Sequence, residues 1–138
     1  MTITQIQIRL VRRSFGRAAT KKRLIAALFY DRLFELDPAL RPMFKGDMEE
    51  QGRKFMRMLA LIVSHLDNPD QLKTKLQSSN QRHTTIGVRP EHYETVGAAL
   101  LWALEMGLGK EFTPAMREAW LTAYEIIAQL ANPYASTG

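Results

Sequence analysis

The histidines are the first candidates for metal chemistry, because the chain has no cysteine. They are His65, His83 and His92, and none has a second histidine four residues away or a glutamate three residues before it. Such pairs place two ligands on one helix face in zinc and di-iron sites, so the sequence predicts neither. The lack of cysteine also excludes disulfides, thiolate catalysis and cysteine-held iron–sulfur clusters.

Two other catalytic patterns are missing. Gly107 and Gly109 precede Lys110, but the sequence has neither the preceding strand nor the Gly-Lys-Ser/Thr ending of a phosphate-binding loop. Glycine is also typical of a helix end, which explains the pair without a ligand. No serine lies in a nucleophile-elbow pattern, so serine–histidine hydrolysis is not predicted either.

A group of single residues on separate segments remains. Its members are Tyr30, Phe44, Gln51, Phe55, His83 and Tyr93. Each has an ordinary structural explanation: a core tyrosine with a satisfied hydroxyl, a glutamine that caps a helix or faces water, or a histidine near a helix end. Residue type alone therefore leaves both the structural and the chemical explanation open.

Length and composition limit the class of protein. With 138 residues, of which 46% are hydrophobic and 24% charged, the chain fits one domain, and we expect a single domain over 1–138. No apolar run approaches the roughly 18 residues that cross a bilayer, and the first residues do not read as a signal peptide. We therefore expect a cytoplasmic protein with no membrane segment.

The net charge of +5 is unevenly distributed. The basic residues that precede the first acid, Asp31, are Arg9, Arg12, Arg13, Arg17, Lys21, Lys22 and Arg23. Such a segment can attract nucleic acid, an anionic membrane or an acidic protein, although a solvated helix face explains it as well. Because no nucleic-acid recognition motif accompanies it, nucleic acid is not the expected partner.

Prolines and glycines divide the chain into segments with helical spacing, and sustained strand-like alternation is absent. We expect helices over 3–15, 19–35, a short turn from Asp37, a helix opened by Asp47 as N-cap, then 69–83, 90–106 and 114–131. Gly16 is expected to mark a break or a tight crossing after the first helix, and Gly107 with Gly109 to end the 90–106 helix. The fold class is all-α, and spacing alone leaves a helix bundle and a globin-like arrangement open.

Taken together, the segments resemble the globin family. The resemblance rests on residues 28–34 (LFYDRLF), 40–44 (LRPMF), 51–56 (QGRKFM), 82–88 and 92–97, which occur in the right order and spacing. It extends from about residue 5 to 131 and is greatest to bacterial single-domain haemoglobins of the flavohaemoglobin-like class. Neuroglobin is a more distant likeness, over residues 100–120. The resemblance implies a globin fold with about seven helices around a haem pocket.

The resemblance also implies a cofactor, haem b (iron protoporphyrin IX), with His83 as the proximal iron ligand. Ser79 lies one turn earlier and offers an acceptor for the other ring nitrogen, and Tyr93 supports the same side. The glutamate that this class often has near the end of the last helix has no counterpart in residues 131–135. The other residues implied to contact haem are Phe44, Lys54, Val88, His92 and Val96.

On the distal side, the resemblance assigns Tyr30 and Gln51 as hydrogen-bond donors to a gas. Phe55, on the same helix face as Gln51, could narrow the cavity, gate entry or displace Gln51, and the sequence does not choose among these roles. His65 lies about 21 Å along a helix from Gln51, so it cannot be a sixth ligand unless the helix rearranges.

The function implied first is reversible O2 binding for storage, delivery or scavenging, with CO and NO as further ligands. One alternative is a nitric oxide dioxygenase that works with a separate reductase, for which the basic N-terminal segment offers a docking face. The other alternative is a haem-based gas sensor module.

Overall fold

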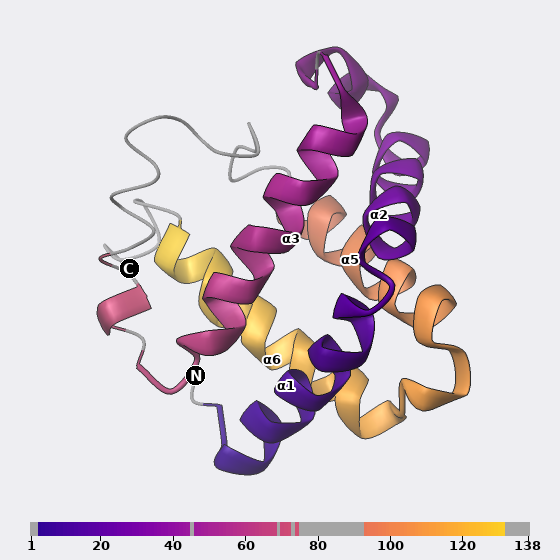
Figure 1. Ribbon diagram of the computed structural model, residues 1–138. Helices are drawn as coiled ribbons and strands as arrows, with labels where there is room; N and C mark the ends of the chain where they lie inside the picture. Colours follow the sequence, from indigo (N-terminus) through magenta and orange to yellow (C-terminus); the bar gives the residue numbers. More distant parts are fainter. Residues whose placement is uncertain (1–2, 45, 69, 73, 75–92, 132–138) are drawn as a thin grey trace.

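The computed structural model describes residues 3–44, 46–68, 70–72, 74 and 93–131 (Figure 1). The elements are α1 (Gln5–Ala19), α2 (Lys22–Leu36), the 3-10 helix η1 (Pro38–Met43), α3 (Met48–Ser64), α5 (Tyr93–Leu108), the 3-10 helix η3 (Gly109–Glu111) and α6 (Pro114–Ala131). No strand occurs within these residues, and the prediction of an all-α fold is confirmed.

Polar residues fix where several helices begin. The Asp47 side chain accepts a hydrogen bond from the Glu49 backbone amide at 2.9 Å, and the Thr113 hydroxyl accepts one from Met116 at 3.2 Å. Each of these contacts satisfies an amide that has no partner within its helix. The starts of α3 and α6 therefore fall where the sequence predicts them.

Two predicted helix ends are wrong. The first helix continues through Gly16, which is exposed and has open space where a Cβ would lie, so the helix bears only the small intrinsic cost of glycine. Gly107 lies inside α5. Glycine is needed at this position because a Cβ would collide with the side chain of Ile25 in α2. Gly109, with φ of +59°, makes the turn after α5.

Two sets of helix contacts build the core. The helix α2 packs against α5 and α3, and α1 packs against α6 and α3 (Figure 1). Where α1 meets α6, the fully buried Trp120 donates from its indole nitrogen to the Ser14 hydroxyl at 2.7 Å. Ser14 in turn donates to backbone carbonyls of its own helix, so this polar contact is satisfied inside the core. The N-terminal helix is thereby joined to the last one.

Among the described residues, no helix is both long enough and apolar enough to cross a membrane.

Candidate functional site

Five aromatic side chains gather where α2, the corner after η1 and α3 meet. The members of this aromatic cluster are Phe29, Tyr30, Phe34, Phe44 and Phe55. The Phe29 and Phe55 rings are stacked at 4.1 Å, whereas Phe44 and Phe55 meet Tyr30 edge to face at 5.4 and 5.9 Å. Three predicted site residues, Tyr30, Phe44 and Phe55, are thus brought together in one apolar wall.

The Tyr30 hydroxyl is the polar group inside this wall. Tyr30 is only 4% exposed, and its hydroxyl donates to the Gln51 backbone oxygen at 3.5 Å. That distance is at the outer limit of a hydrogen bond, so the contact is weak. Burial raises the pKa of Tyr30 well above its usual value of 10.0, so the hydroxyl keeps its proton even in alkaline solution. A protonated donor with a poor partner can turn to a better acceptor.

The first turns of α3 position the other predicted distal residues. Gln51 is half-buried and Lys54 is exposed, while Phe55 is 2% exposed. The Phe55 ring lies against Phe29 and Tyr30, so it forms part of the wall supplied by α2.

A close helix crossing sets the distance between Tyr30 and Gln51. A Cβ built on Gly52 would lie 3.0 Å from the Cβ of Ala26, which is tighter than an ordinary contact. Because Gly52 follows Gln51 directly and Ala26 is one helical turn before Tyr30, glycine here lets α3 approach α2 closely. The sequence analysis missed this contact, although small residues on both helices were a visible signal.

The start of α5 carries two more predicted residues, Tyr93 and Val96. Val96 is buried, and the Tyr93 carbonyl accepts a hydrogen bond from the Tyr124 hydroxyl of α6. A Cβ on Gly97 would meet the Tyr124 ring at 2.7 Å, so glycine makes room for that ring. Tyr124 was not predicted as part of the site, and Gly97, one turn after Tyr93, was the available signal.

Both of these tyrosines are held in the protonated form. Burial raises the pKa of Tyr124, with a smaller upward contribution from Tyr93 and an opposing one from a backbone hydrogen bond of Gly97. Burial also raises the pKa of Tyr93. These two hydroxyl groups therefore stay neutral to a higher pH than the hydroxyl of an exposed tyrosine.

The remaining predicted residues, Ser79, His83, Val88 and His92, lie outside the described part of the chain. Within the described part there is no group of three or more histidine, aspartate and glutamate residues that could hold a metal ion.

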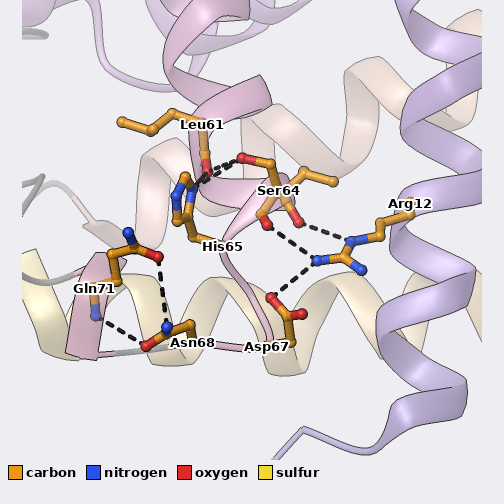
Figure 2. A network of polar contacts seen from close by, with 8 residues as sticks. Arg12, Leu61, Ser64, His65, Asp67, Asn68 and Gln71 are labelled. Carbon is orange, nitrogen blue, oxygen red and sulfur yellow. Dashed lines mark hydrogen bonds and ion pairs between the residues drawn. The ribbon is translucent and has the colours of Figure 1, made fainter.

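A polar network closes the far end of α3 (Figure 2). The Arg12 guanidinium of α1 donates to the backbone oxygens of Val63 and Ser64 at 3.2 and 3.1 Å and pairs with Asp67 at 3.1 Å. A cation at a helix C-terminus satisfies carbonyls that have no partner within the helix. Arg12 therefore fixes α3 at the end opposite Gln51.

His65 belongs to the same end of α3. Its Nδ1 lies 2.9 Å from the Leu61 carbonyl oxygen and 2.9 Å from the Ser64 hydroxyl (Figure 2). It is the C-cap of α3, at the end of this helix opposite Gln51.

Comparison with known proteins places this chain in a family. The model of the family described as Globin matches residues 27–130. The chain is 30% identical to neuroglobin of Tetraodon nigroviridis, over 94% of this chain and 91% of that protein. It is also 30% identical to the flavohemoprotein of Rhodopirellula baltica, where the match covers 93% of this chain but 32% of the longer protein.

Comparison with solved structures also gives matches of the same fold. An engineered carbene transferase, described as a putative nitric oxide dioxygenase from Rhodothermus marinus, superposes with a TM-score of 0.83 at 28% identity, over 99% of this chain and 95% of that one. A bacterial globin from Campylobacter jejuni has the same fold, with a TM-score of 0.82 and 24% identity, over 97% of each chain. The chain belongs to the globin family. Its relatives are neuroglobins and bacterial globins including flavohemoproteins, and this membership supports haem-based gas binding.

Proposed function

We propose that the chain holds haem b through His83 and binds O2 reversibly, as a cytoplasmic protein for oxygen storage, delivery or scavenging. One observation carries the gas-binding part. A buried, protonated Tyr30 hydroxyl has only a 3.5 Å contact to the Gln51 backbone oxygen, inside a wall of aromatic side chains. Membership of the globin family supports the cofactor.

The described residues fit a flat apolar cofactor. Phe44 is 7% exposed and meets Tyr30 edge to face, so its ring offers apolar area beside the distal donor. Lys54 is exposed on α3, where its ammonium can reach a propionate at the rim of the pocket. Val96 adds a buried aliphatic surface from α5.

When bound, haem supplies an iron with one coordination position for a diatomic gas. Tyr30 and the Gln51 amide would then both donate hydrogen bonds to a ligand that carries partial negative charge. Moving the Tyr30 hydroxyl away from the Gln51 backbone oxygen loses little, since that bond is long. The stacked pair of Phe29 and Phe55 excludes water behind these donors.

The proximal side of the proposal rests on the family. His83 would be the iron ligand, Ser79 would accept from its second ring nitrogen, and Val88 and His92 would contact the edge of the haem. Tyr93 would approach the same side, and its backbone is held by Tyr124.

The test compares O2 and CO release from the haem-loaded protein. Tyr30→Phe and Gln51→Leu should each speed O2 release by about ten- to a hundredfold, because a buried hydrogen bond to a charged partner is worth roughly 1.5–3 kcal/mol. CO release should change far less, because CO attracts the donors weakly. If neither variant changes the O2 rate, the distal assignment is wrong. A His83→Ala variant that keeps the ferric, reduced and carbonmonoxy spectra would refute the proximal assignment.

A second candidate, nitric oxide dioxygenase, is favoured by the likeness to the putative enzyme from Rhodothermus marinus and to flavohemoproteins. Such an enzyme would draw on a reductase, and the exposed Arg9 and Arg13 of α1 offer a basic face on which one could dock. Repeated consumption of NO with NADH and a reductase would support an enzyme. A single stoichiometric reaction with NO would support a carrier.

A further inference from the structure

The helices α2 and α5 lie side by side along one flank of the molecule and carry exposed apolar side chains (Figure 1). Lys21, at the start of α2, donates to the Gly107 carbonyl near the end of α5 at 3.2 Å. The Arg32 guanidinium, further along α2, lies 5.2 Å from the centre of the Trp102 ring, nearer the start of α5. The two helices therefore run in opposite directions. Of the five large apolar side chains that are exposed in the described part of the chain, three belong to this pair: Leu24, Leu36 and Met106.

The outward side chains of this pair form two ridges. Residues four positions apart lie on one ridge of a helix surface. The ridges are side by side, because Arg32 lies over Trp102 and a Cβ on Gly107 would be 3.8 Å from the side chain of Leu28. We call them together the α2–α5 face, whose members are Leu24, Leu28, Arg32 and Leu36 on α2 and Ala98, Trp102 and Met106 on α5.

The two ends of the α2–α5 face carry opposite charge. Exposed Lys21 and Lys110 lie where α2 begins and α5 ends, and exposed Glu35 and Glu94 lie at the other end. In α2 this distribution opposes the helix dipole, since the first turn has no acid and the last turn has no base. Helix stability therefore does not explain the charges, whereas attraction to a surface with the reverse arrangement does.

A second copy of the chain has that reverse arrangement. A two-fold axis that passes between α2 and α5, perpendicular to the α2–α5 face, exchanges its two ends. The basic end of each copy then meets the acidic end of the other, and the apolar ridges meet at the centre. A uniformly acidic or uniformly basic partner would be attracted at one end and repelled at the other.

The size of the α2–α5 face indicates a weak dimer. Residues 24–36 span about 18 Å along α2, and two adjacent helices are about 20 Å wide, so the projected area is about 360 Å². A standard interface buries about 800 Å² of accessible surface on each partner. Accessible area exceeds projected area because side chains protrude, which brings this face toward the small end of stable interfaces. We expect association at micromolar concentrations and a monomer on dilution.

We propose that two copies of the chain associate through the α2–α5 face as a two-fold symmetric dimer, with the apolar ridges at the centre and the charged ends paired crosswise. Association removes leucine and methionine side chains from water, and the half-buried Trp102 is of the residue type that contributes most at interfaces. Phe29 and Tyr30 are buried on the inner side of α2, so each copy keeps its own gas site.

The experiment is sedimentation velocity of the haem-loaded full chain from about 1 to 500 µM protein. We expect a monomer, with a chain mass of 15.8 kDa, at the low concentrations and a dimer of twice that mass at the high ones. Raising the salt from about 0.05 to 0.5 M should weaken the dimer, because it screens the charged ends.

An apolar-to-acidic exchange locates the centre of the interface. Met106→Glu, at a position that is 59% exposed, should weaken the dimer about tenfold or more, because it buries a carboxylate between apolar ridges. Ile6→Glu is the matched control, at a position on α1 that is 67% exposed and outside the α2–α5 face, and it should leave the dimer unchanged. Circular dichroism and the unfolding midpoint at dilute protein should match the parent in both variants.

Charge reversal tests the crosswise pairing. Glu35→Lys and Lys110→Glu should each weaken the dimer about three- to tenfold, and the double variant should bind more tightly than either single one. Glu118→Lys, an equal charge change at an exposed position of α6, is the control and should have no effect. A merely structural role of these residues would give no such rescue.

Several outcomes would overturn the proposal. They are a monomer at every concentration, an assembly larger than a dimer, equal weakening by Met106→Glu and Ile6→Glu, or no rescue in the double variant. A dimer that strengthens with salt would also refute the crosswise pairing. None of these results bears on O2 release, so failure here is distinguishable from failure of the proposed globin function.

Discussion

The two faces of α3 differ in almost every property although they share one helix. On the front face, Gln51 and Phe55 meet the aromatic cluster, and Phe55 stacks on Phe29 at 4.1 Å. On the back face, small residues and arginines line an open groove between the end of α1, α2 and α3. A helix repeats every 3.6 residues, so one 17-residue sequence can place two different surfaces on opposite sides. Gly52 lies between them, where α2 crosses.

The largest expected effect comes from removing an aromatic ring that packs against the front face of α3. Phe29→Ala removes a ring that is 2% exposed and stacked on Phe55, so the free energy of unfolding should fall by about 3–5 kcal/mol. Chemical denaturation measures this loss. Leu24→Ala, at a position on the same helix that is 48% exposed, serves as the control and should change stability by less than about 0.5 kcal/mol. Similar losses in both variants would contradict the packing described for α2.

A smaller loss of stability is expected from a change at Gly52, which lies between the two faces of α3. Gly52→Val forces a branched side chain into a space where even a Cβ lies 3.0 Å from Ala26, so stability should fall by about 1–3 kcal/mol. O2 release should change as well, because the variant separates α2 from α3. Gly16→Ala, which has open space and lies within α1, should instead stabilise by about 0.5–1 kcal/mol. A neutral Gly52→Val would show that the crossing tolerates expansion.

The smallest effect at neutral pH concerns the buried tyrosines. The pKa values of Tyr30 and Tyr124 are raised by burial above 10.0 in the folded protein, so above pH 10 the unfolded chain loses protons that the folded chain retains. Their contribution to stability is complete below pH 10 and decreases as the pH rises beyond it. Tyr30→Phe and Tyr124→Phe should therefore each flatten the alkaline loss of stability, measured as denaturation midpoints from pH 8 to 11.5. An unchanged alkaline slope in both variants would contradict this assignment.

Local signals predicted much of the fold. Asp47 and Thr113 act as caps through contacts with residues two or three positions away, and a sequence pattern records such contacts. Gly107 was misjudged because its role depends on Ile25, which comes from a different helix. Glycine is common both at a helix end and where two helices approach closely, and only the packing in the structure distinguishes the two cases.

The site residues likewise divide into those that the sequence pattern predicted and those whose role depends on packing between helices. Tyr30, Phe44 and Phe55 were predicted from the family pattern and do lie together, whereas Phe29, Phe34 and Tyr124 were missed. Phe29 and Phe34 read simply as apolar positions of a helix, and their ring contacts depend on how α2 is rotated. The groove behind α3 was beyond sequence reasoning, because it is defined by the space between three helices.

The contact between Ser14 and Trp120 has a consequence for how the chain folds as it is made. The two residues are 106 positions apart, so α1 leaves the ribosome first but cannot make this contact until α6 has been synthesised. At about 5–20 residues per second, this wait lasts roughly 5–20 seconds, during which Ile8 and Val11 lack the partners that later bury them. The newly made N-terminal helix therefore leaves apolar side chains incompletely covered until the last helix is made.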